Sequence, residues 1–422
     1  MILKQFHISN FKMFDDLKLN FESGFNLLLG DNGVGKTTIL EAITVGISGF
    51  LVGMEDVPTR NIYKKDVHYD IVKDNNGVPN KIYKDFTEVE SKILYGDTEY
   101  WWSRAKKGVT GSSRTTINPR DIIKTSHALI NSTEDVMLPL ISYQSASRHW
   151  ISARSDANEK KRKQLHNRRC GYLGCLDNTS NLSTITNWCK QMEWGSLRMN
   201  HVSENYEEFA NIVSKFMSIM NEGRVSKVIF NPNSEKLLYF EDGEYKDIED
   251  LSAGYQSILN LILDLAYRAA ILNPDAGEKI SQVEGVVLID EIDSNLHPKW
   301  QWRIVDALVE TFPNVQFIAA THSPIIVSSC KNASIISIDN KKNVRYIGDS
   351  YAFSVNEILK DMFGYYMRPA IIEDLIEEFE KGMDREDYSS AKKALMNLSQ
   401  LLGEKHPNVV ALQTEYNIEA EE

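Results

Sequence analysis

The sequence has few cysteines and no long hydrophobic run. Four cysteines in 422 residues are too few for a disulfide framework, which indicates a reducing compartment. No stretch of about 18 apolar residues occurs, so we expect no transmembrane helix. The first twelve residues lack a basic segment followed by an apolar one, and they are typical of a strand rather than a signal peptide. We therefore expect a cytoplasmic protein without membrane contact.

The chain also lacks an excess of basic residues. Its 47 lysines and arginines against 59 acidic residues give a net charge of −12, which excludes a uniformly basic coat for nucleic acid. A local basic groove stays open, because binding follows local charge. With 42% hydrophobic and 25% charged residues, the composition is that of an ordinary globular protein. The length allows one large α/β domain with additions, or two to three smaller domains.

A glycine-rich segment, GDNGVGKT, spans residues 30–37 and matches the pattern G-x-x-x-x-G-K-[ST]. It lies between an apolar strand pattern at 25–29 and a helical pattern at 38–47, the context expected for a phosphate-binding loop. Its glycines allow backbone N–H groups to surround the β-phosphate, and Lys36 reaches the β- and γ-phosphates. The alternative is a chance glycine-rich turn. The predicted ATP-binding residues are Asn32, Gly33, Gly35, Lys36, Thr37 and Thr38, with Thr37 also a ligand of Mg²⁺.

A second segment, VVLIDE at 286–291, reads as a central strand that ends in two acids. Asp290 stands at the carboxyl end of the strand, where a magnesium ligand is expected. Glu291 is then placed to polarise the attacking water as a general base. The alternative is a solvated acidic turn after a core strand.

A third segment, LSAGYQ at 251–256, resembles the LSGGQ signature of ABC-type ATPases. Ser252 offers a hydroxyl, Gly254 permits close backbone approach, and the following helix directs its N-terminus at anionic oxygen. We predict that Ser252, Gly254 and Gln256 contact ATP. An ordinary helix start is the alternative, but the segment lies between the loop and the acidic strand, which is the order found in ABC enzymes.

Two further residues are candidates for catalysis. His322, in THSP at 321–324, resembles the switch histidine that contacts the γ-phosphate. A structural histidine after a strand is the alternative, but the place of His322 about 30 residues beyond Glu291 favours the switch role. Gln144, in SYQSASR, is a candidate Q-loop glutamine that would bridge Mg²⁺ and the attacking water, although it also fits an ordinary strand end. The segment 293–298, DSNLHP, occupies the place of the D-loop, with His297 where an aspartate is usual.

Together these segments resemble the ABC-type, AAA-type ATPases related to RecF, Rad50 and SMC heads. The group includes the PtuA-like ATPases of Septu antiphage systems, which work with an HNH nuclease of PtuB type, and ATPases beside retrons. Besides the four motifs, the resemblance includes RRCGYLGCLDNTSN at 168–181 and NEILKDMFGYYMRP at 356–369. It implies an α/β fold of the ABC-type P-loop ATPase head, a mixed sheet plus a helical lobe, with a helical insertion and a helical C-terminal region.

The resemblance also implies a division of the chain. We expect the N-terminal part of the head over 1–154, a mostly helical insertion over 155–225, the C-terminal part of the head over 226–350, and a helical region over 351–422. The insertion is too short for a long coiled coil. After Pro324 there is neither an acidic motif nor enough chain for a Toprim nuclease, so we expect no nuclease site in this chain.

The implied function is an ATP- and Mg²⁺-dependent ATPase that senses invasion and controls a partner HNH nuclease. The expected assembly is a head-to-tail dimer or a higher oligomer, in which Lys36 of one copy and Ser252 of another hold the same ATP. Two alternatives stay open: an ATP-bound scaffold with negligible turnover that restrains a nuclease, and a RecF-like DNA-repair ATPase. DNA remains a candidate partner.

Four weaker features are kept as hypotheses. The basic cluster at 160–169 fits either a nucleic-acid contact or a solvated helix face. A zinc site is a remote alternative to ordinary thiols at His166, Cys170, Cys175 and Cys189. The acidic run at 373–387 is expected to be a solvated helix face rather than a docking surface. Trp101 and Trp102 are expected to pack under a hairpin, with base stacking as the alternative.

Overall fold

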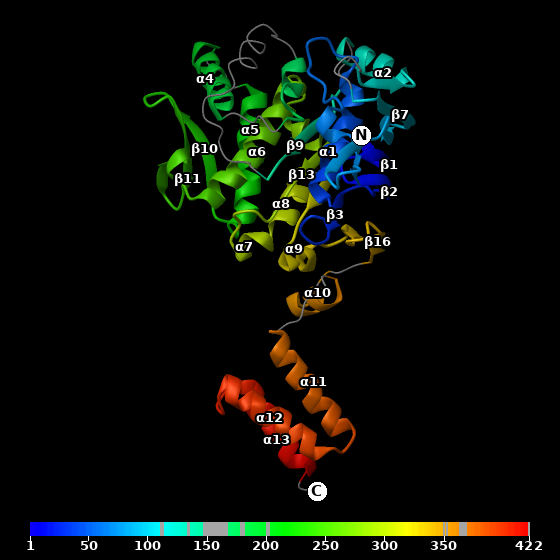
Figure 1. Ribbon diagram of the computed structural model, residues 1–422. Coiled ribbons are helices and arrows are strands. Elements are labelled where there is room, and N and C mark those ends of the chain that lie inside the picture. The colour runs from blue at the N-terminus through cyan, green and yellow to red at the C-terminus, as the bar shows by residue number, and fades with distance from the viewer. Residues whose placement is uncertain are drawn as a thin grey trace. The chain divides into compact units, whose positions relative to one another are not determined.

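The computed structural model describes residues 1–109, 114–132, 136–146, 168–177, 182–199, 203–348, 351, 353–362 and 369–420. The chain divides into two compact units, Met1–Ala352 and Phe353–Glu422, which are described separately here. Figure 1 shows the first unit as sheets covered by helices and the second as helices alone. Within the described residues, no helix is both long and apolar enough to cross a membrane.

The centre of the first unit is a six-stranded sheet. Five of its strands are parallel, and only β16 runs antiparallel to its neighbour. The strand order is β16 (Val344–Ile347), β15 (Ser334–Ile338), β3 (Phe25–Leu29), β14 (Val315–Ala320), β13 (Gly285–Ile289) and β9 (Leu140–Gln144). All residues of β3, β9, β13 and β14 are buried, as expected for parallel strands covered on both faces.

A five-stranded antiparallel sheet packs on the other side of helix α1 (Lys36–Leu51). Its order is β2 (Phe14–Asn20), β1 (Ile2–Phe11), β6 (Phe86–Tyr95), β7 (Thr98–Lys107) and β8 (Thr116–Asn118). Trp102 of β7 is buried, and its indole N–H donates a hydrogen bond of 2.8 Å to Gly46 O in α1. Trp101 is 49% exposed, so the prediction that both tryptophans pack under the hairpin is wrong for Trp101, because successive residues of a strand point to opposite faces.

Helices gather on the remaining side of the unit. Helix α5 (Glu204–Met220) contacts α6 (Ala253–Leu272), α8 (Ile304–Thr311) and β10 (Ser226–Asn231), and it lies in the segment predicted to be a mostly helical insertion. The small sheet β10, β11 (Lys236–Glu241) and β12 (Glu244–Asp247) lies beside them (Figure 1). The other elements of this unit are β4 (Tyr69–Lys73), β5 (Pro79–Tyr83), α2 (Asp121–Ile130), α4 (Leu182–Met199), α7 (Pro298–Gln301) and α9 (Pro324–Ser329).

The second unit has a small core of its own. Its helices are α10 (Val355–Asp361), α11 (Ala370–Asp384), α12 (Tyr388–Leu402) and α13 (Pro407–Ala420). Phe379 and Leu395 are buried between α11 and α12, whereas Glu377 and Glu378 of the acidic run are exposed. The run is therefore the polar face of an amphipathic helix.

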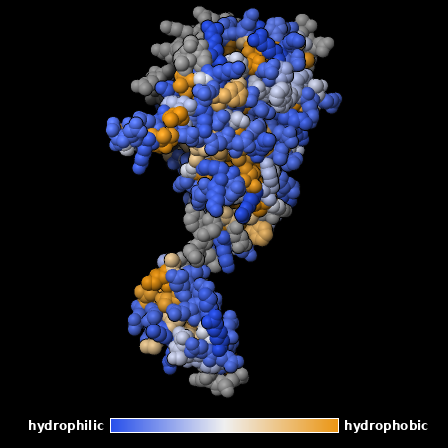
Figure 2. All heavy atoms as spheres, turned by 45° about the vertical axis from the view of Figure 1, so that its right-hand side comes forward, coloured by the Kyte–Doolittle hydropathy of each residue, from blue (hydrophilic) through white to orange (hydrophobic). Residues whose placement is uncertain are grey.

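Figure 2 shows hydrophilic side chains over much of the visible surface, with smaller apolar patches between them.

Candidate nucleotide-binding site

The register of the central sheet brings the predicted motifs to one edge. Ile289 pairs with Gln144 on one side and with Ala319 on the other, and Ala320 pairs with Leu28 of β3. The carboxyl ends of these parallel strands therefore lie side by side, and each is followed by one of the motifs. This edge is where ligands bind in open α/β sheets.

The glycine-rich loop has the backbone that its sequence predicts. Gly33 and Gly35 have φ values of 85° and 108°, a left-handed region that side chains disfavour. Asn32, Gly33 and Thr37 are exposed, so the loop and the first turn of α1 face solvent. Because the first N–H groups of a helix have no partner within it, this turn can bind phosphate.

Lys36 is the centre of the site. Its ammonium donates to Gly30 O (2.7 Å) and Asp31 O (3.1 Å) and lies 2.8 Å from Nε2 of His322. The side chain is buried, and this burial lowers the pKa of Lys36 to about 8 despite the raising effect of Asp290 and other carboxylates.

Asp290 and Glu291 follow the end of β13, as predicted. Asp290 is only 3% exposed, and its N–H donates to Gln144 O at 2.8 Å. Glu291 is exposed and has a φ of 44°, a left-handed conformation that costs a non-glycine residue free energy. The two carboxylates thus have different environments: one is buried beside the lysine, and the other faces solvent on a strained turn.

The switch segment is joined to the D-loop through Asp293. One carboxylate oxygen of Asp293 accepts hydrogen bonds from the hydroxyl of Thr321 and the N–H of His322. Burial of the imidazole lowers the pKa of His322 below its ordinary value, and the positive charge of the neighbouring Lys36 lowers this pKa further. His322 is therefore placed as a neutral imidazole beside the ammonium of Lys36. This contact of Asp293 was not predicted, although the position of Asp293, three residues after Asp290, indicates that it lies near the site.

The signature segment lies at the start of α6. Ser252 is exposed and its side chain makes no capping hydrogen bond to the helix. A Cβ added at Gly254 would lie 2.7 Å from Asn295 O, so this glycine permits close packing of the signature on the D-loop. The amide of Gln256 donates to Glu249 O (2.8 Å) and Leu251 O (2.9 Å), which places it as a support of the loop.

Gln144, the candidate Q-loop glutamine, is held by its amide nitrogen. Its amide is buried and donates to Ser142 Oγ (2.9 Å) and to Asp264 Oδ2 (2.7 Å) in α6. Asp264 also binds Arg268 at 2.8 Å, and Arg268 donates to Gly171 O. Burial alone would lower the pKa of Arg268, but Asp264 offsets this effect and raises it. A buried charge pair, which was not predicted, thus holds the amide nitrogen. The amide oxygen Oε1 is buried without a hydrogen-bond partner among the described residues, and the Q-loop role of Gln144 stays a prediction.

The structure describes only some residues of the basic cluster and of the candidate zinc site. Arg168 donates to Leu272 O (2.7 Å) and Val136 O, so its guanidinium fastens the end of α6 and does not stand on a solvated helix face. Lys160–Lys163 and His166 lie outside the described residues. Cys175 is buried, which raises its thiol pKa to about 12. Within the described residues, no group of three or more His, Cys, Asp or Glu side chains could hold a metal by itself.

Comparison with known families decides the membership of the chain. Residues 5–265, more than half of the sequence, match a family model described as an AAA domain. The chain belongs to this AAA domain family. Together with the mixed sheet and its covering helices, this membership confirms the predicted fold class.

Relatives of the chain include a retron probable ATPase and a Septu protein. A Retron Ec83 probable ATPase from Escherichia coli is 26% identical, over 97% of this chain and 85% of that protein. The Septu protein PtuA from Bacillus thuringiensis is 25% identical, over 96% of each chain. An SMC head bound to the C-winged helix domain of ScpA is 18% identical and covers 82% of this chain and 98% of its own, with a TM-score of 0.48. The predicted similarity to Septu and retron ATPases is confirmed.

Proposed function

We propose that the chain hydrolyses ATP between two of its copies, and that the ATP state of the pair controls a partner HNH nuclease in cytoplasmic antiphage defence. The convergence of Lys36, Asp290 and His322 at one sheet edge supports this proposal, because it joins a phosphate-binding lysine, a metal-binding carboxylate and a neutral imidazole. The AAA domain family and the relatives named as ATPases support the same chemistry.

ATP binding falls to the loop and the start of α1. Lys36 would exchange its bonds to Gly30 O and Asp31 O for bonds to phosphate oxygens, while the backbone N–H groups of the loop surround the β-phosphate. Thr37 and Asp290 supply oxygen ligands of the kind that Mg²⁺ prefers. When bound, this ion neutralises the charge of the phosphates.

Hydrolysis would use the residues that follow β13 and β14. Glu291 accepts a proton from the attacking water, for which its exposed position beside the loop is suited. His322, already in contact with Lys36, donates a hydrogen bond toward the γ-phosphate. Asp293 holds the backbone of the switch segment and orients this histidine.

The signature residues would act on a second copy. Tyr255 of this segment contacts β11 and α7 of its own chain: it donates to Glu241 (3.0 Å) and packs edge-on against Trp300 at 4.5 Å. Ser252 and the N-terminus of α6 remain exposed for an ATP held by Lys36 of the partner copy. A head-to-tail dimer completes two such sites, and higher oligomers can be built from these pairs.

The nuclease partner is the least direct part of the proposal. It rests on the similarity to Septu PtuA over nearly the whole chain. A RecF-like repair ATPase and an ATP-bound scaffold with negligible turnover are the competing functions. A pull-down from the native host, with the native mass of the complex, separates them: a stoichiometric HNH nuclease supports the proposal, and repair proteins or a lone ATPase dimer contradict it.

Two substitutions test the catalytic part. We expect Lys36→Ala to abolish ATP binding, because the site loses its only buried ammonium within the described residues of this edge.

We expect Glu291→Gln to retain ATP binding but to lower kcat by about a hundredfold or more, because a general base contributes about that much. ATP binding and single-turnover hydrolysis are measured on each variant. Normal hydrolysis by Glu291→Gln would remove this residue from the mechanism.

A further inference from the structure

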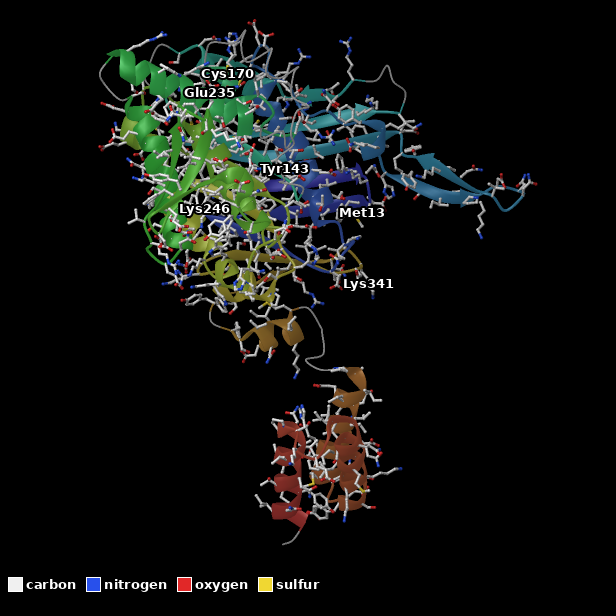
Figure 3. All side chains as sticks on the ribbon, turned by 90° about the vertical axis from the view of Figure 1, so that its left-hand side faces the viewer. Met13, Tyr143, Cys170, Glu235, Lys246 and Lys341 are labelled. Atoms are coloured by element: carbon white, nitrogen blue, oxygen red, sulfur yellow. The ribbon has the colours of Figure 1, made fainter. Side chains whose placement is uncertain are left out.

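A two-stranded hairpin stands apart from the other sheets. Strands β4 and β5 pair only with each other, and all their residues are exposed except the half-buried Tyr69 and Tyr83. Figure 3 shows the hairpin projecting beyond the head at the right of the view. An isolated two-stranded hairpin in water is marginally stable, so a projecting one is a candidate binding element.

The register of the hairpin sorts its side chains by charge. Cross-strand partners share a face, and the next pair along points the other way. One face, called here the cationic face, consists of the pairs Tyr69–Tyr83, Ile71–Lys81 and Lys73–Pro79. The opposite face consists of the pairs Asp70–Ile82 and Val72–Asn80, with Asp70 bound to Lys84 at 2.9 Å. The paired residues of the cationic face thus include no carboxylate, in a chain of net charge −12.

Aromatic rings and ammonium groups alternate on this face. The rings of Tyr69 and Tyr83 lie 5.5 Å apart. Lys81 Nζ lies 4.1 Å from the centre of the Tyr69 ring, and Lys64 Nζ lies 5.2 Å from that of Tyr83. Each of these ammonium groups lies over a ring, so a base that stacks on that ring face must displace the lysine, whose ammonium then remains close enough to contact a backbone phosphate.

The acid at the tip of the hairpin does not interrupt this pattern. Asp74 accepts hydrogen bonds of 2.9 Å from the N–H groups of Asn76 and Val78. Its carboxylate is therefore engaged in closing the turn, as aspartates in turns commonly are. The strands themselves leave the cationic face open from the tyrosine pair to Lys73.

We propose that the cationic face binds single-stranded nucleic acid. The phosphates would contact Lys64, Lys73 and Lys81, and unpaired bases would stack on the tyrosine rings. A duplex keeps its bases stacked on one another, so it would use the cations but not the rings. An acidic protein segment would likewise leave the rings without flat partners. No residue of the nucleotide site takes part, so this inference stands independently of the proposed function.

A matched pair of neighbouring substitutions tests the role of the face. Lys81→Gln and Ile82→Glu change the net charge equally, but their side chains point to opposite faces of β5, and Ile82 is exposed. Binding of the full-length protein to a labelled oligothymidylate is followed by fluorescence anisotropy over a range of salt. We expect Lys81→Gln to weaken binding and to lower the slope of log K against log salt by about 0.7. Equal effects of the two variants would overturn the proposal.

The role of the rings is tested separately. We expect Tyr69→Leu to weaken binding of oligothymidylate by about tenfold, in keeping with the loss of one stacked base. The melting temperature and the ATPase rate of each variant should equal those of the unchanged protein, which shows that the fold is intact. Absent binding, equal affinity for a duplex of the same length, or polyglutamate binding at the same site would each contradict a single-strand surface.

Discussion

At the scale of single residues, Lys36 has an unusually low pKa for a lysine. Its ammonium is held by two carbonyl oxygens and the imidazole of His322, and burial lowers its pKa to about 8. A bound polyphosphate would place several negative charges beside it and raise this pKa again. Protonation of Lys36 and binding of ATP are therefore linked.

This linkage predicts proton uptake on ATP binding. At about pH 9 most free sites hold a neutral Lys36, so binding should take up about one proton per ATP, whereas at about pH 7 the uptake by Lys36 should be near zero. The affinity for ATP should consequently fall as the pH rises above 8, by up to about tenfold per pH unit. Calorimetric titrations in buffers of different ionisation enthalpy measure the uptake, and equal uptake at both pH values would contradict the linkage.

Some site residues could be predicted from local sequence patterns, whereas the contacts of others depend on residues far away in the chain. Lys36, Asp290 and His322 each follow a buried strand, and parallel strands must bring such ends together, so their convergence could be predicted. The orientation of Gln144 could not, because its partner Asp264 lies 120 positions away and no local pattern joins them. The side-chain contacts of Gln144 depend on how β9 packs against α6.

At the scale of elements, the signature helix α6 and the D-loop form one contact. Gly254 lies against Asn295 O so closely that no side chain fits between them. The D-loop in turn holds the switch segment through Asp293. A movement of α6 on ATP binding by a second copy would thus be transmitted to His322 through neighbouring backbone.

Adding one methyl group tests this contact. We expect Gly254→Ala to lower ATP turnover by about tenfold or more, because its Cβ, 2.7 Å from Asn295 O, must displace the D-loop. ATP binding to Lys36 should change little. Gly348→Ala is the control, since no atom lies within 4 Å of its added Cβ. If both variants hydrolyse ATP at the unchanged rate, the close packing has no role in turnover.

The elements themselves were largely predictable, and their deviations have physical causes. The strand predicted over 25–29 and the helix predicted from 253 onward match β3 and α6, because apolar runs and helical spacing are local signals. The alternation of β7 should have separated the two tryptophans: Trp102 fills the core beneath the sheet, and Trp101 faces outward. The sorting of charges in the hairpin of β4 and β5 depends on the register, which only the structure supplies.

At the scale of the whole molecule, the proposed site needs parts of two copies. A head-to-tail dimer uses Lys36 of one copy with Ser252 of the other, so each copy contributes differently to each site. Two variants that fail in different halves of the site should therefore complement each other. This behaviour is not expected of a site that lies within one chain.

Mixing variants gives the decisive measurement. Lys36→Ala retains a sound signature, and Ser252→Arg, which places a bulky cation at an exposed position, retains a sound phosphate loop. Each variant alone should be inactive. In an equal mixture about half of the dimers are mixed, and each mixed dimer regains one of its two sites, so about a quarter of the full ATPase rate should return. Size-exclusion chromatography of the mixture with ATP should show the paired species. Recovery of no activity, although mixed dimers form, would mean that the signature of one copy does not complete the site of another.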